Sequence, residues 1–156
     1  MLGDTAVACH PDPSGALEER IAETREKLER APRRERAAVD EEIARLEARR
    51  ASHLPTLDRL IEMARDGRRV MLPLLERPMP LIADDWAKPE LGSGCVKITP
   101  GHDPNDYEVW RRHEGEIDII NILNPDGTLN GNAGPYAGLD RIAARDRVVE
   151  DLEARG

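Results

Sequence analysis

The chain has 156 residues, a formal net charge of −8, 35% charged residues and no phenylalanine. We therefore expect one modest domain with an appendage, and a core built from Leu, Ile, Val and Ala. Its two cysteines, Cys9 and Cys95, are too few for a disulfide scaffold and favour a reducing, cytoplasmic compartment. No apolar run approaches the length of about eighteen residues that a membrane span needs, and no signal-peptide pattern opens the chain.

A charged, glycine-free segment lies between Gly15 and Gly67, where nearly half of the residues are charged. Acid-to-base pairs at helical spacing accompany a narrow apolar stripe of the coiled-coil kind. The pattern predicts an antiparallel hairpin of two helices at about 16–30 and 33–52, with the chain reversing at Pro32. A third apolar helical segment is expected after the hairpin.

This helical segment divides the chain. We predict a domain made of residues 1–13 and 67–156, into which residues 14–66 are inserted. A solvated helical spacer is the interpretation we favour for the insertion, and a docking surface is the alternative. Residues 15–66 carry thirteen acids and twelve bases, which leaves eighteen acids and eleven bases elsewhere. Neither part has the excess of Lys and Arg that tight phosphate binding requires.

Short apolar runs dominate the remaining sequence. Runs at 69–75 and 79–83, both punctuated by proline, predict edge or corner strands, and further strands are expected at 95–99 and 116–122. Residues 140–154 have the apolar periodicity of an amphipathic helix. Strands with segregated helices indicate the α+β class.

The segment that follows the strand at 95–99 combines turn and cap signals. Pro100 and Gly101 stop the strand, and Asp103 can cap a helix that starts at Pro104, a residue suited to the first helical position. Asp103 and Asp106 are one helical turn apart and are expected to project on the same side. The same residues also suit an ordinary turn and cap.

The run at 92–109, GSGCVKITPGHDPNDYEV, resembles the signature of the editing domain of valyl-tRNA synthetases, which are class I aminoacyl-tRNA synthetases. Related isoleucyl and leucyl editing domains share the fold, but they usually lack Lys-Ile-Thr-Pro before the His-Asp pair. Further stretches match in the same order, at 2–8 with 10–12, 80–85, 119–127 and 138–149.

The resemblance implies a compact, β-barrel-like core that hydrolyses the ester of mischarged threonyl-tRNA(Val). Valine and threonine are nearly isosteric, so a hydrophobic pocket for valine rejects the added hydroxyl by only about a hundredfold. The His-Ile-Gly-His and Lys-Met-Ser-Lys-Ser hallmarks of aminoacylation are absent from the chain. ATP and Mg are therefore expected only at the aminoacylation site of the parent enzyme, and no cofactor or metal is expected here.

Carried over residue by residue, the resemblance assigns two catalytic residues. Asp103 would bind the substrate α-ammonium, and Lys97 would stabilise developing negative charge or contact the terminal adenosine. Asp106 would read the threonine hydroxyl, and Thr99 would line the pocket beside Lys97. His102 is placed among the substrate-binding residues, with a structural role favoured over direct chemistry. The nucleophile would be a positioned water.

The resemblance also implies partners. They are the 3′ end of tRNA(Val) carrying threonine, bound weakly by this segment alone, and the rest of the parent synthetase, with no membrane partner. A Thr-x-Arg-Pro-Glu-Thr strand precedes Met-Leu-Gly-Asp in the family, so one wall of the pocket is expected to be incomplete here. Two alternatives stay open: an isoleucyl or leucyl type of editing domain, and a non-catalytic interaction module working through the hairpin at 16–66.

Overall fold

A computed structural model describes residues 1–156, which divide into two compact units. The first consists of Met1–Val7, Arg69–Pro80 and Lys97–Gly156, and the second of Ala8–Arg68 and Leu81–Val96. The boundary runs through three strands. All of the predicted insertion at 14–66 lies inside the second unit, and its status as an inserted domain stays a prediction.

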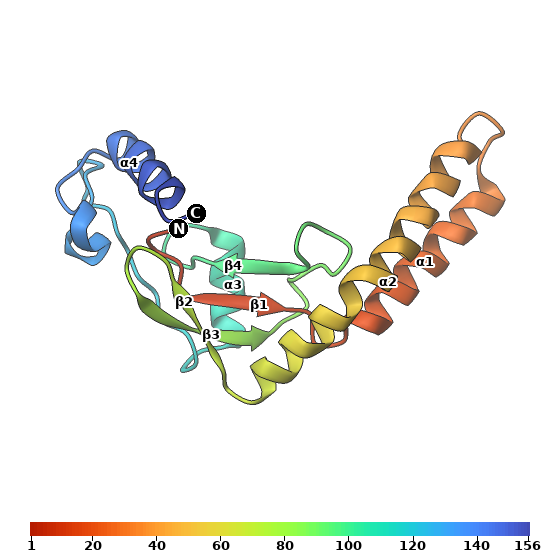
Figure 1. The fold of residues 1–156 in the computed structure, drawn as a ribbon, viewed down its shortest axis with the longest axis horizontal. Coiled ribbons are helices and arrows are strands. Elements are labelled where there is room, and N and C mark those ends of the chain that lie inside the picture. The colour runs from red at the N-terminus through yellow and green to blue at the C-terminus, as the bar shows by residue number, and fades with distance from the viewer. The chain divides into compact units, whose positions relative to one another are not determined.

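The strands form one four-stranded sheet with the order β2-β3-β1-β4. Strands β2 and β3 are antiparallel, with Arg69 opposite Pro80 and Leu72 opposite Arg77, whereas β1 and β3 run in the same direction (Figure 1). The sheet is open, because β2 and β4 are its edges. The α+β class is confirmed, and barrel-like closure is not. The strands are β1 Ala6–Cys9, β2 Arg69–Leu72, β3 Arg77–Ala83 and β4 Cys95–Ile98.

Two long helices, α1 Pro13–Arg30 and α2 Arg36–Arg65, lie side by side (Figure 1). Helix α1 begins earlier than predicted because the Asp12 carboxylate accepts a hydrogen bond from the Gly15 amide and Pro13 occupies the first turn. It ends before Pro32, and the residue before that proline is extended.

Helix α2 continues far beyond the predicted end at residue 52, through Pro55. The sequence-based prediction therefore split one helix into two. Tertiary contacts override the local penalty of an internal proline, since Leu57 and Ile61 beyond it are buried. Cross-helix ion pairs join Arg20 to Glu42 at 3.0 Å and Arg25 to Glu47 at 2.6 Å.

The remaining helices begin at side-chain caps supplied by Asp103, Asn130 and Asp140. They are α3 Pro104–Arg112, the 3-10 helix η1 Gly131–Tyr136 and α4 Arg141–Glu153. The first and last agree closely with the predicted helices. None of the helices is both long enough and apolar enough to span a membrane.

The predicted strand at 116–122 is wrong. This stretch contains no named strand and contributes only an isolated bridge between Glu114 and Ile117. Side chains satisfy part of its backbone: the Ile122 amide donates to the His102 ring, and the Asn121 carbonyl accepts from Asn130 and Asn132. The Ile122 carbonyl accepts from the Asn130 amide at 2.9 Å. The alternating isoleucines therefore did not indicate sheet pairing.

The first unit has its own apolar core around α4 and η1. Its buried members are Leu2, Leu129, Ala133, Tyr136 and Ala144. Aromatic residues are scarce, and Tyr136 supplies the one large ring of this cluster, with its hydroxyl donating to Asp151 at 2.8 Å. This core holds the chain segments on which the candidate site is built.

Gly94→Ala is expected to lower the free energy of unfolding by about 2–4 kcal/mol, through backbone strain and overpacking together. Gly94 has φ +80°, and a Cβ there would lie 2.6 Å from Cδ2 of Leu57, a fully buried side chain. Gly92→Ala is the matched control, because Gly92 also has a positive φ of +46° but nothing within 4 Å. Urea denaturation measures both, and equal losses would contradict a packing role for Gly94.

Candidate functional site

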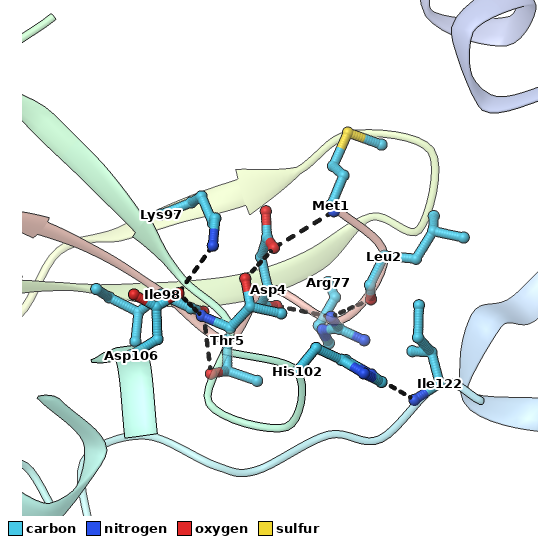
Figure 2. Close-up of polar contacts among 11 residues, drawn as sticks. Met1, Leu2, Asp4, Thr5, Arg77, Lys97, Ile98, His102, Asp106 and Ile122 are labelled. Atoms are coloured by element: carbon cyan, nitrogen blue, oxygen red, sulfur yellow. Dashed lines mark hydrogen bonds and ion pairs between the residues drawn. The ribbon is translucent and has the colours of Figure 1, made fainter. Parts of the chain in front are cut away.

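The turn between β4 and α3 brings predicted site residues together. After Ile98 the Thr99 carbonyl accepts hydrogen bonds from the amides of His102 and Asp103, at 3.0 and 3.1 Å. These bonds fold the chain back so that α3 starts directly beside the end of β4. As a result, Lys97, on the strand, reaches Asp106, in the first turn of the helix (Figure 2).

Asp106 is the most buried member of the site, with 2% of its surface exposed. Its Oδ2 atom accepts from Lys97 Nζ at 2.8 Å and from the Thr99 amide at 2.9 Å. Both contacts use the same oxygen, so Oδ1 keeps its capacity to accept. The Lys97 side chain is half exposed, and an ammonium has three donors, of which one is used here.

Asp103 also makes its structural hydrogen bonds through a single carboxylate oxygen. Its Oδ1 atom accepts from the amides of Asn105 and Asp106, at 2.8 and 3.4 Å, which confirms its predicted role as the cap of α3. The second oxygen, Oδ2, takes no part in the cap. Each of the two carboxylates therefore uses one oxygen for the fold and leaves the other available.

Thr99 leads to a residue for which the sequence analysis proposed no role. Its hydroxyl donates to Asp4 Oδ1 at 2.6 Å, and both side chains are buried. Asp4 is fixed in turn by Arg77, whose Nη2 atom donates to the Asp4 and Leu2 carbonyls at 2.7 and 2.8 Å (Figure 2). An aspartate in the apolar stretch Leu-Gly-Asp-Thr-Ala-Val-Ala was the available signal, because a buried carboxylate needs a partner.

His102 is oriented away from the Lys97–Asp106 pair. Its Nε2 atom accepts a hydrogen bond from the Ile122 amide at 3.1 Å (Figure 2). Burial of part of the ring lowers the pKa of His102 below the ordinary 6.5. Both observations favour the neutral imidazole, which holds the segment around Ile122 in place.

Acidification is expected to reduce the free energy of unfolding through His102. Its folded pKa lies below the unfolded value of 6.5, so the neutral ring is present in both states above that value. As the pH falls from about 7 to about 5, the unfolded chain takes up the proton more readily and stability is lost. Urea titrations of the parent and of His102→Gln should diverge over this range, and identical pH profiles would contradict the assignment.

A pocket of about 420 Å³ adjoins this turn within the first unit. Thr99 and His102 lie in its wall, whereas Lys97, Asp103 and Asp106 do not. The remaining lining is mostly apolar, with two guanidinium groups from α4, and comprises Met1, Leu2, Gly3, Ile122, Leu123, Leu129, Arg141, Ala144, Arg145, Val148 and Val149. The five predicted residues therefore separate into a polar cluster and a pocket wall that share one turn.

The polar cluster offers carboxylate acceptors for an ammonium or a hydroxyl group. A carboxylate oxygen is a strong acceptor for either group, and charge-assisted bonds of this kind are roughly twice as strong as neutral ones. Lys97 adds a positive charge beside them, where negative charge could develop. No group of three His, Cys, Asp or Glu residues in the chain could hold a metal ion.

The sequence of the chain is similar to those of several known proteins. The chain is 56% identical over 156 residues to a valine–tRNA ligase of Rhodopirellula baltica, covering all of the chain and 15% of that protein. A valine–tRNA ligase of Synechocystis is 51% identical over 90 residues, or 58% of the chain and 10% of that protein. One of Lactiplantibacillus plantarum is 50% identical over 99 residues, or 64% of the chain and 11% of that protein.

No protein-family model matches the chain. It spans about a seventh of the length of the Rhodopirellula relative, so the likeness concerns one segment of a much longer protein. That likeness nevertheless runs through the whole chain, including β4, the turn and α3. The chain belongs to the valyl-tRNA synthetase family, as a fragment of such an enzyme.

Proposed function

We propose that this segment is the editing domain of a valyl-tRNA synthetase and hydrolyses the ester of threonyl-tRNA(Val). The observation that carries the proposal is the pair of carboxylates at the β4–α3 turn. In Asp103 and in Asp106, one carboxylate oxygen accepts hydrogen bonds from the protein and the other is available to a ligand. Such a pair suits a substrate that carries both an ammonium and a hydroxyl, as threonine does.

Asp106 would supply the discrimination. Its Oδ2 is held by Lys97 and the Thr99 amide, which leaves Oδ1 to accept the threonine hydroxyl. Valine has a methyl group at that position and would leave a buried carboxylate oxygen without a donor. Leaving a buried acceptor unpaired costs about 1–3 kcal/mol, and more for a charged group. The site would thus reject the cognate amino acid and accept the error.

The other residues would bind the substrate and stabilise charge. Asp103 Oδ2 would pair with the α-ammonium, because a partly exposed carboxylate on a fixed cap is a ready partner for a cation. Lys97 would offer its unused donors to the oxygen that becomes negative when a positioned water attacks the ester. Thr99 and His102 would shape the adjoining wall, since both line the neighbouring pocket.

The proposed partners are the 3′ end of tRNA(Val) carrying threonine and the rest of the synthetase. Net charge favours weak tRNA binding by this segment alone, because residues outside 15–66 carry eighteen acids against eleven bases. ATP and Mg would serve the aminoacylation site elsewhere in the enzyme. The relatives described above are valine–tRNA ligases, which supports the valyl type over the isoleucyl and leucyl types.

Binding of two non-hydrolysable analogues, threonyl-adenosine and valyl-adenosine, tests the proposal by calorimetry. The threonyl analogue should bind about tenfold to a hundredfold more tightly, and Asp106→Ala should remove this preference. Glu108→Gln is the matched control, because Glu108 lies on the same helix with its side chain exposed. Equal affinity of the unaltered protein for both analogues would contradict the proposal. The same measurement on a complete ligase that carries this segment should give the same preference, and equal affinities there would also contradict the proposal.

The helices α1 and α2 offer a second candidate function, an interaction module. Their outer faces are largely exposed and charged, although such faces are also typical of a solvated spacer. Replacing residues 14–66 by a short glycine–serine linker separates the two. If the variant still prefers the threonyl analogue, the helices have a role outside editing. If the variant no longer binds a macromolecule that the unaltered protein binds, the helices act as an interaction module.

A further inference from the structure

A pair of thiols lies in the second unit, and neither thiol belongs to the candidate site. Cys9 ends β1 and Cys95 begins β4, and these two strands are neighbours in the sheet. Their Sγ atoms are 3.9 Å apart and both cysteines are free. A disulfide has an S–S length of about 2.05 Å, so the sulfurs need to approach by only about 2 Å to bond.

Contacts on both sides keep the two thiols together. The Cys9 carbonyl accepts from the Asp84 amide at 2.9 Å, and the Cys95 amide donates to Ser93 Oγ at 3.3 Å. Just before Cys95, Gly94 rests against the buried side chain of Leu57. The juxtaposition is therefore a property of the folded unit and does not depend on the thiols themselves.

The two thiols differ in access and acidity. Cys9 is almost completely buried, whereas Cys95 is partly exposed. The neighbouring Cys9 thiol can donate to an ionised Cys95, which lowers the pKa of Cys95 to about 7. The hydrogen bond with Cys95 and burial raise the pKa of Cys9. Cys95 is thus the thiol that reacts first, and Cys9 is the second thiol, which can react with the oxidised Cys95.

We propose that Cys9 and Cys95 form a reversible intramolecular disulfide when the folded chain meets a peroxide. The inference rests on the placement of the two sulfurs and is independent of the proposed editing activity. A reducing compartment keeps both thiols free, so the disulfide is a transient response to oxidant.

The chemistry balances in two steps with hydrogen peroxide as oxidant. The Cys95 thiolate attacks one peroxide oxygen, the O–O bond breaks, and hydroxide leaves and takes up the thiol proton as water, which gives a sulfenic acid. Cys9 sulfur then attacks the Cys95 sulfur, the S–O bond breaks, and hydroxide leaves with the Cys9 proton as a second water. Two thiols lose two electrons in total, and one peroxide becomes two waters.

The test is oxidation of the native chain 1–156 by hydrogen peroxide, followed by alkylation in denaturant and peptide mapping without reduction. Both thiols should disappear together, the peptides of Cys9 and Cys95 should be joined within one chain, and dithiothreitol should restore them. A sulfinic acid on Cys95 with Cys9 still free, or a disulfide between chains, would overturn the proposal. So would a disulfide that forms only after unfolding.

Two single variants test the order of the steps. In Cys95→Ser, Cys9 should stay a thiol at peroxide levels that oxidise the parent, because it is buried and has lost its reactive neighbour. In Cys9→Ser, Cys95 should still react but should accumulate sulfenic or sulfinic acid. Equal loss of Cys9 in the parent and in Cys95→Ser would show that Cys95 does not act first. The oxidised parent should also unfold at a higher temperature, since the crosslink joins positions 86 residues apart.

Discussion

Asp106→Ala is expected to lower the free energy of unfolding by about 2–4 kcal/mol, because a buried carboxylate that accepts two hydrogen bonds disappears. The Thr99 amide donates to that carboxylate at 2.9 Å and would lose its acceptor. Lys97 loses its partner as well, but its side chain is half exposed and can return to water. Most of the loss therefore comes from the amide and from the space that Asp106 fills.

Two companion variants separate these contributions in urea denaturation. Asp106→Asn keeps the volume and an acceptor oxygen, so we expect a loss of about 1 kcal/mol. Lys97→Met removes only the half-exposed ammonium, and its loss should stay within about 1 kcal/mol. If Asp106→Ala cost no more than Lys97→Met, the Thr99 amide would not depend on Asp106. The three variants together measure what the turn contributes before any ligand binds.

Thr99→Val is expected to destabilise the protein by about 2–3 kcal/mol. The substitution keeps the shape but removes the hydroxyl that donates to Asp4 at 2.6 Å. The Asp4 carboxylate is buried and would lose this donor. A buried charge with too few donors is costly.

A double-mutant cycle measures this coupling directly. Asp4→Leu combined with Thr99→Val replaces both polar partners by apolar groups, so the pair should cost less than the sum of the single losses. Thr5→Val is the matched control, because the Thr5 hydroxyl makes a longer bond of 3.4 Å to the Ile98 carbonyl. Additive losses for Asp4 and Thr99 would contradict a direct interaction.

Local signals predicted the parts of the fold that short-range chemistry decides. Asp103 followed by Pro104 identified the start of α3, because a cap and a first-turn proline act within a few residues. The strand at 95–99 and the final helix were predicted for the same reason. The isoleucine-rich stretch at 116–122 was wrongly predicted to be a strand. Part of its backbone is bound by side chains that are distant in the sequence, such as His102.

In the candidate site, too, residues close together in the sequence were predicted and residues from distant segments were not. The resemblance assigned Lys97 and Asp106 to one site with separate roles, and the structure adds the ion pair that joins them across the turn. Asp4 and Arg77 were not predicted, because they approach the turn from segments more than twenty residues away in the chain. No periodicity connects such segments, and only the folded sheet brings them together. The roles proposed for the five site residues stay predictions until a ligand is bound.

The buried residues of α1 and α2 are distributed unevenly along the two helices. In α1 the last buried residue is Thr24, and in α2 the first is Val39, so the end near the turn at 31–35 buries very little. Opening that end exposes almost no apolar surface, and its amides should exchange with deuterium at a much lower free energy than those around Leu57 and Ile61. Protection should rise steadily away from the turn. The tip is accordingly the place where the chain would tolerate lengthening or shortening with the least thermodynamic consequence.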